Sequence, residues 1–152
     1  MDIKITQNWL NDYIESNVSP QKISELLNLY GPSVERREEV AGDTVYSIEV
    51  TTNRVDAASV MGIARELTAI LPRDGYEIKT KTPKEIDLPF KQKASVMVIN
   101  DPELATRLMV VECKNITIKP SPDFIQQRLS AIGVKPKNNV VDITNYVMYE
   151  RG

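Results

Sequence analysis

The stretch NNVVDITNYVMYERG (residues 138–152) combines several amide side chains with a run of Val, Ile and Met. Part of it recurs at the spacing of one helical face, which predicts a helix. The residues at this spacing are Val140, Val141, Thr144, Val147 and Met148. Asn138 or Asn139 can cap the start of this helix. Asp142 falls in its first turn, where the helix dipole favours a carboxylate.

The first 14 residues predict a short strand, residues 2–5, followed by a helix over residues 7–14. Thr6 can serve as the N-cap of that helix. Trp9 and Tyr13 share one helical stripe with Leu and Ile neighbours. An aromatic stripe at this spacing is typical of a core, so we predict that both rings are buried.

Two further helices begin at a Ser-Pro pair, and each is followed by Gly. Ser caps the orphan N–H groups, Pro fits the first helical position, and Gly fits the residue past the end. These helices are expected between Ser19 and Gly31, and between Ser121 and Gly133.

The segment NRVDAASVMGIARELTAILP (residues 53–72) predicts another helix, capped by Asp56 or Asn53 and ended by Pro72. Its residue spacing alone indicates a capped surface helix, on which the charged side chains of Arg65 and Glu66 are both exposed to solvent. Alternating apolar residues predict strands elsewhere. These strands are expected at residues 33–40, 44–51, 94–100, 107–113 and 116–118.

The composition excludes several classes of site. The chain of 152 residues has no histidine, which excludes His-based metal sites and Ser-His or Cys-His catalysis within it. Cys113 is the sole cysteine, so no intramolecular disulfide can form; in a strand-like run it is expected to be a buried, inert thiol. The net charge of −2 provides no overall positive field for nucleic acid. From the residues alone, the chain is typical of a scaffold or binding module.

The N-terminus is neither a signal peptide nor a transit peptide, and no apolar run approaches membrane-spanning length. We therefore expect a cytoplasmic protein. The residues themselves indicate no catalytic, cofactor-binding or metal-binding side chain.

Four blocks of sequence resemble the β subunit of bacterial-type phenylalanyl-tRNA synthetase, and they occur in the order of that family. The blocks are IKITQNWLNDYI (3–14), ISELLNLYGPSVE (23–35), IEVTTNRVDAASVMGIAREL (48–67) and ITIKPSPDFIQQRLSAIGVKPKNNVVDITNYVMYERG (116–152). The string from Pro136 to Met148 is the most specific. Thr52 stands where the family usually has Pro.

The resemblance implies an α+β fold in two parts. Residues 1–82 would form a small three-helix, winged-helix-like N-terminal domain of the B1 type. Residues 83–93 would be a linker, and residues 94–152 would be the beginning of a B3/B4-type α/β editing domain, truncated before its end. The family usually inserts an OB-fold tRNA-binding domain near residues 36–46, and only a few residues stand there in this chain.

The resemblance also implies a function and a partial site. Thr144 and Asn145 match positions in the family's editing pocket, which hydrolyses tyrosine wrongly attached to the phenylalanine tRNA. The neighbours Val140, Val141 and Val147 would pack behind the pocket together with Met148. The whole enzyme would use ATP and magnesium, and it would pair this subunit with a catalytic α subunit in an α2β2 heterotetramer.

The chain itself would be a structural part of that enzyme, inactive alone, with phenylalanine tRNA bound through the whole enzyme and with no DNA or membrane partner. The alternatives are an independent winged-helix-like nucleic-acid-binding module and a free-standing accessory protein. The helix after Arg54 carries only Arg65 as a base, which argues against DNA reading.

Overall fold

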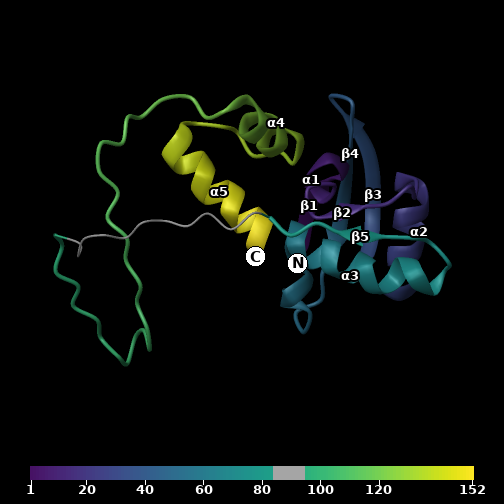
Figure 1. The fold of residues 1–152 in the computed structure, drawn as a ribbon, viewed down its shortest axis with the longest axis horizontal. Coiled ribbons are helices and arrows are strands. Elements are labelled where there is room, and N and C mark those ends of the chain that lie inside the picture. The colour runs from purple at the N-terminus through teal and green to yellow at the C-terminus, as the bar shows by residue number, and fades with distance from the viewer. Residues whose placement is uncertain (84–94) are drawn as a thin grey trace. The chain divides into compact units, whose positions relative to one another are not determined.

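The computed structural model describes residues 1–83 and 95–152. Contacts divide the chain into two units. The first unit joins Met1–Pro83 to Lys119–Gly152, and the described part of the second is residues 95–118. The C-terminal helices therefore share one unit with the N-terminal part of the chain (Figure 1).

A three-stranded antiparallel sheet lies in the first unit. Its strands, in spatial order, are β1 (Asp2–Thr6), β4 (Asp43–Glu49) and β3 (Ser33–Val40). In the register of β1 and β4, Ile3 faces Ile48 and Ile5 faces Tyr46, and all four side chains are buried. Apolar residues at alternate positions thus form the core face of the sheet, and the strands predicted here are confirmed.

A two-residue turn connects β3 to β4. Val40 pairs with Asp43, and between them Ala41 (φ 52°) and Gly42 (φ 81°) both have positive φ. Two positive φ values are what a type I′ hairpin turn requires, because its twist matches that of the strands. The hairpin occupies the region near residues 36–46, where the resemblance indicated a missing insertion.

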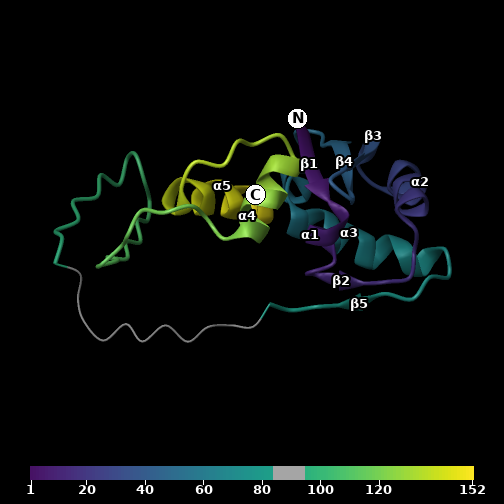
Figure 2. The ribbon, with the colours of Figure 1, turned by 90° about the horizontal axis from the view of Figure 1, so that it is seen from above.

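The first helix, α1 (Gln7–Leu10), is shorter than predicted. Thr6 caps it as expected, since its hydroxyl oxygen accepts the N–H of Trp9 at 3.2 Å. The helix does not reach residue 14, because the chain turns into β2 (Ile14–Glu15), which pairs with β5 (Lys79–Thr80) in a separate two-stranded sheet (Figure 2). Pairing with a distant strand has overridden the local helical pattern.

The core of the first unit contains both aromatic residues that were predicted to lie there. Trp9 is fully buried and Tyr13 is almost so, which confirms that prediction. The other large, fully buried side chains of the described residues come from strands and helices alike: Tyr46, Ile5, Leu10, Ile14, Ile23, Leu26, Leu27, Ile48, Ile63, Leu67 and Leu71. Burying a Leu- or Ile-sized side chain contributes about 1.5–3 kcal/mol, so this set is the main source of stability.

The helix α2 (Pro20–Tyr30) begins and ends as its sequence predicts. The hydroxyl oxygen of Ser19 accepts the N–H of Lys22 at 3.3 Å, Pro20 is the first helical residue, and Gly31 follows the last turn. The helix packs against β3 and α3.

The helix α3 (Val60–Arg73) follows a short 3₁₀ turn, η1 (Val55–Ala57). Its cap is Ser59, whose hydroxyl oxygen accepts a backbone N–H, and the prediction of Asp56 or Asn53 as cap is wrong. The carboxylate of Asp56 is bound instead by arginine side chains. Ion pairs with two nearby arginines therefore occupy the carboxylate that was predicted to cap the helix.

The proline at position 72 lies in the last turn of α3 and does not end it, contrary to the prediction. The helix extends one residue further, to Arg73, and Asp74 is its C-cap. The predicted end therefore differs from the observed one by a single residue, within the usual fraying of helix ends.

The last two helices are α4 (Asp123–Ala131) and α5 (Asn139–Arg151), which contact each other. Gly133, at φ 87°, follows α4 as predicted. Pro122 occupies the N-cap position, so the prediction of Ser121 as cap is wrong. The hydroxyl of Ser121 donates to a carboxylate of α5 instead.

The described part of the second unit, residues 95–118, contains neither helix nor strand. The strands predicted at 94–100, 107–113 and 116–118 are therefore absent from the residues that the structure describes. An isolated strand leaves its N–H and C=O groups unpaired, so alternation alone does not hold a strand without a partner. The linker predicted at 83–93 lies almost wholly outside the described residues.

Two hydrogen bonds connect the two sides of the second unit. The carboxylate of Glu112 accepts the backbone N–H of Ser95 at 2.8 Å and its hydroxyl at 2.7 Å, and these bonds lower the pKa of Glu112. Cys113 is exposed, so the prediction of a buried thiol is wrong.

Candidate functional site

The amides that open α5 hold the start of the helix. The side-chain oxygen of Asn138 accepts the N–H groups of Val140 and Val141, each at 3.1 Å, which confirms Asn138 as the cap. Asn139 binds the backbone of Lys119 instead: its N–H donates to the Lys119 carbonyl at 2.9 Å, and its side-chain oxygen accepts the Lys119 N–H at 3.1 Å. Both amides therefore have structural partners.

Asp142 is a buried carboxylate in the first turn of α5, with 1% of its surface exposed. It accepts a hydrogen bond from the hydroxyl of Ser121 and another from the backbone N–H of Lys137 at 2.8 Å. The Ser121 hydroxyl, and then the backbone N–H groups of Lys137 and Asn138, lower the pKa of Asp142 despite its burial. The ionised carboxylate thus ties the chain before α4 to the start of α5.

Thr144 and Asn145, the two residues assigned to an editing pocket, lie in the middle of α5. Thr144 is exposed, and its hydroxyl donates to the carbonyl of Val140 at 3.1 Å. That bond uses the hydroxyl proton and leaves the oxygen able to accept a second hydrogen bond. Asn145 is half-buried, and successive helical residues point about 100° apart, so the two side chains point in different directions.

The face of α5 that carries Thr144 is apolar and exposed. The exposed apolar residues of this helix are Val140, Val141, Ile143, Val147 and Met148. These side chains are exposed in the 152-residue chain, so the expectation that Val140, Val141, Val147 and Met148 pack behind the pocket stays a prediction. The side of α5 that packs on the core carries Asp142, Tyr146 and Tyr149.

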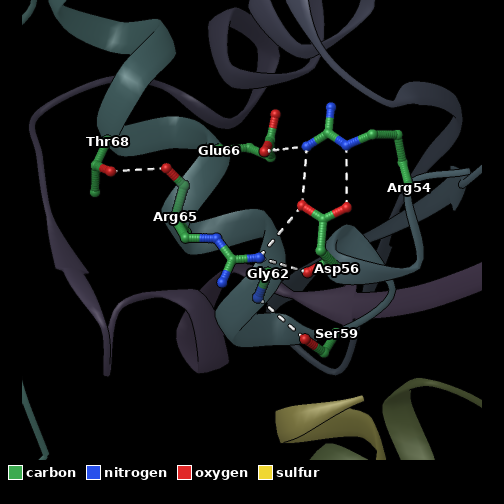
Figure 3. A network of polar contacts seen from close by, with 7 residues as sticks. All are labelled: Arg54, Asp56, Ser59, Gly62, Arg65, Glu66 and Thr68. Carbon is green, nitrogen blue, oxygen red and sulfur yellow. Dashed lines mark hydrogen bonds and ion pairs between the residues drawn. The ribbon is translucent and has the colours of Figure 1, made fainter.

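A second polar cluster surrounds the start of α3 and includes Arg54, Asp56 and Glu66 (Figure 3). The guanidinium of Arg54 binds Asp56 through two bonds, Nε to Oδ1 at 3.0 Å and Nη2 to Oδ2 at 3.1 Å. The same Nη2 donates to Glu66. A fork of this kind fixes both partners in one geometry. Glu66 is only 18% exposed, so the expectation that its side chain is solvated is wrong.

Arg65 adds a second cation to this cluster. Its Nη2 donates to the carbonyl of Asp56 at 2.8 Å and lies 3.4 Å from the carboxylate, while most of the side chain is exposed. Hydrogen bonding to Arg54 and the positive charges of Arg54 and Arg65 lower the pKa of Asp56. The partners Asp56 and Glu66 raise the pKa of Arg54. Both shifts favour the charged forms of Asp56 and Arg54, which are the forms that the ion pair needs.

Gly62 allows the turn before α3 to pass close to the helix. A Cβ atom there would lie 2.3 Å from the carbonyl oxygen of Asp56 and 2.8 Å from the Cα of Ala57. Its N–H donates to the hydroxyl oxygen of Ser59 at 3.0 Å (Figure 3). The sequence predicted only a capped helix over residues 53–72. In the structure, the Arg, Asp, Ser, Gly and Glu residues of this segment together shape the turn before α3.

Across residues 1–83 and 95–152, no group of three or more His, Cys, Asp and Glu side chains could hold a metal ion. In the same residues, no helix is long and apolar enough to cross a membrane.

The C-terminal third of the chain is similar to a known domain family. Residues 104–152 match the model of the B3/4 domain. This match includes α4, α5 and the helix positions of Thr144 and Asn145.

Along most of its length, the chain is similar to curated phenylalanine–tRNA ligase β subunits. It is 34% identical to the subunit of Rhodopirellula baltica over 149 residues, which is 97% of this chain and 21% of that protein. It is 40% identical to that of Porphyromonas gingivalis over 116 residues, 74% of this chain and 14% of the relative. For Geobacter metallireducens the identity is 41% over 112 residues, 72% of this chain and 14% of the relative.

These matches confirm the resemblance to the phenylalanine–tRNA ligase β subunit that the sequence blocks indicated. The chain spans about a fifth or less of the length of the relatives that it matches.

Proposed function

We propose that this chain is a structural, non-catalytic part of the β subunit of a phenylalanine–tRNA ligase. The observation that carries the proposal is the similarity to such subunits over 97% of the chain, at 34% identity. The B3/4 match at residues 104–152 supports it independently. The chain by itself would be inactive.

The proposal extends to the enzyme in which this part would work. That enzyme would attach phenylalanine to its tRNA with ATP and magnesium, and a catalytic α subunit would complete an α2β2 heterotetramer. The cytoplasmic location, the three-helix winged-helix-like arrangement of residues 1–82 and the B3/B4-type editing fold of residues 94–152 stay predictions. That this chain lacks the family's OB-fold insertion near residues 36–46 is also a prediction.

Within that enzyme, Thr144 and Asn145 would belong to a pocket that recognises tyrosine attached to the wrong tRNA. Tyrosine differs from phenylalanine by one hydroxyl, and a site built to bind that hydroxyl strongly disfavours the residue that lacks it. The hydroxyl of Thr144 already donates to the carbonyl of Val140, which leaves its oxygen as an acceptor. We therefore expect the tyrosine hydroxyl to donate to Thr144.

The test is Thr144→Val in the complete two-subunit enzyme. The change is nearly isosteric and removes the acceptor, which is worth about 0.5–1.5 kcal/mol, or up to about 3 if a buried group is left unpaired. Deacylation of tyrosyl-tRNA should then fall by a few-fold to roughly a hundredfold. Charging with phenylalanine, measured beside it, should stay near normal.

Thr144→Ser is the matched control, because it keeps the hydroxyl and removes only a methyl group. Deacylation should survive in this variant. If charging and deacylation fall together in Thr144→Val, the residue is structural, and the assignment to the pocket is wrong.

A further inference from the structure

One guanidinium joins three elements of the first unit. Arg128, on α4, lies 2.6 Å from the carboxylate of Asp12, measured from Nη1 to Oδ2. The same Nη1 donates to the hydroxyl of Tyr146 on α5, and Nη2 donates to the carbonyl of Asn8 on α1 at 3.4 Å. The side chain of Arg128 is only 16% exposed, whereas that of Asp12 is 49% exposed, so the guanidinium is largely buried and its carboxylate partner reaches solvent.

The hydroxyl that Arg128 binds belongs to a ring that is also held by aromatic contacts. The centroids of Tyr146 and Trp9 are 4.4 Å apart, with the planes tilted by 30°. Phe124 meets Tyr146 edge-on at 6.0 Å. The guanidinium lies 5.7–6.0 Å from the centroids of all three rings. Such distances are favourable for both aromatic and cation–π attraction.

Trp9 is fully buried, yet its indole N–H has no hydrogen-bond partner among the described residues. Stacking and packing therefore hold the ring, and the stack on Tyr146 is its contact with α5. Two independent interactions, the Arg128 bond and the Trp9 stack, converge on this one tyrosine. Together they fix how α5 is rotated about its own axis.

We infer that Arg128 is a positioning residue that sets the orientation of α5 and thereby aims Thr144. Tyr146 is two residues after Thr144, and on a helix the direction of one side chain determines that of the other. Asp12 and Asn8 orient Arg128 from the N-terminal part of the chain, which gives that part a role in the site on α5. The effect on editing rests on the proposed function, whereas the effect on α5 does not.

The first experiment uses the complete two-subunit enzyme with Arg128→Met, which keeps an unbranched apolar stem and removes the charge and the donors. The loss of a charge-assisted hydrogen bond corresponds to a rate that is lower by about tenfold or more. We therefore expect kcat for tyrosyl-tRNA deacylation to fall by that factor. KM and phenylalanine charging should change little. Arg128→Lys keeps the charge near Asp12 but lacks the planar fork, so it should restore part of the rate.

Arg73→Met is the matched control. Arg73 also lies over an aromatic ring, that of Tyr30 at 4.7 Å, but at the far ends of α2 and α3. It should leave deacylation unchanged. A lower melting temperature in Arg128→Met with normal deacylation would overturn the inference, and so would an equal loss of deacylation in the two Met variants.

The second experiment uses the 152-residue chain, in which Trp9 is the sole tryptophan. In Arg128→Met we expect red-shifted Trp9 emission and faster amide hydrogen exchange across α5, and Arg73→Met should show neither change. Unchanged emission and exchange would overturn the inference. If Thr144→Val leaves editing intact, the proposed function fails, and this second experiment still decides the role of Arg128.

Discussion

Ala41 has a backbone conformation that its side chain disfavours. Its φ of 52° lies in the left-handed region, and the next residue, Gly42, has a φ of 81°. A residue with a Cβ atom loses roughly 1–2 kcal/mol in this region, whereas Asn, whose short polar side chain bonds locally, tolerates it well. The hairpin therefore stores a small strain at its first turn residue.

We expect Ala41→Asn to raise the free energy of unfolding by about 0.5–1 kcal/mol, because Asn-Gly is the favoured pair for this turn. Ala41 is exposed, so the new side chain requires no repacking. Urea unfolding followed by circular dichroism measures the change as a shift of the midpoint at constant slope.

Gly42→Ala is the matched control. A Cβ atom at Gly42 would have nothing within 4 Å, so any loss of stability would arise from its backbone conformation alone. We expect that variant to be less stable by about 1 kcal/mol. Equal stability of the two variants would show that the turn does not have the described conformation in solution.

At the scale of elements, the sequence predicted those helices whose ends are fixed locally. Ser19, Pro20 and Gly31 bracket α2 as their residue types require, and Thr6 and Asn138 cap their helices. Each of these contacts spans only a few residues, so it can be predicted from the local sequence.

The misassigned helix ends have different causes. Ser121 donates to Asp142, 21 residues away, and Asp56 is bound by arginine side chains on both sides. The first helix stopped early because residue 14 pairs with Thr80. For Ser121 and Ile14 the deciding partner lies far along the chain, which a local pattern does not indicate. For Asp56 the partners are nearby, and the pattern does not indicate whether the carboxylate binds an arginine or a backbone N–H.

Asp142 gives the connection between α4 and α5 a dependence on pH. Its hydrogen bonds from Ser121 and from the backbone lower its pKa in the folded chain below the ordinary value of 3.8. A lowered carboxyl pKa contributes stability that is present in full above the unfolded value and is lost as the pH falls through the folded one. The stabilisation should therefore be present at neutral pH and disappear in acid, below about pH 4.

We expect Asp142→Asn to have a lower melting temperature than the parent chain at pH 7, and this difference should shrink as the pH falls below about 4. Asp123→Asn, at an exposed carboxylate in the first turn of α4, is the matched control and should show little difference at either pH. Thermal unfolding across a pH series measures both. A difference for Asp142→Asn that stays constant down to pH 2 would contradict the role given to this carboxylate.

At the scale of the whole molecule, the sequence predicted less of the site than of the fold. Spacing alone identified the helix of Thr144 and Asn145, but only the resemblance indicated a role for them. It did not anticipate that the face around Thr144 is exposed, because burial depends on which elements meet. The alternating residues of 95–118 likewise form no strand in the described part of the chain.

The charges of the whole chain bear on its affinity for RNA. It has 19 Lys and Arg against 21 Asp and Glu, a net charge of −2. In the part of the chain that the structure describes, some of these cations are bound to carboxylates: Lys4 to Glu38, Lys22 to Asp74, Arg54 to Glu66, Arg128 to Asp12 and Lys114 to Glu112. A paired cation is a poor phosphate ligand, because a phosphate must compete with its carboxylate. The negative net charge and these ion pairs both weaken the attraction of the chain for a polyanion.

We therefore expect the 152-residue chain to bind phenylalanine tRNA with a Kd of about 10⁻⁵ M or weaker, since phosphate contacts normally supply most of the affinity for nucleic acid. A filter-binding titration in a series of salt concentrations measures both the affinity and its salt dependence. Each phosphate contact adds about −0.9 to −0.7 to the slope of log K against log salt, so the slope here should be shallow. Sub-micromolar binding with a steep slope would show that the chain carries a tRNA-binding surface of its own. The complete enzyme is measured beside the chain. If the enzyme binds the tRNA normally and the chain alone binds it weakly, the contacts that supply the affinity lie outside this chain.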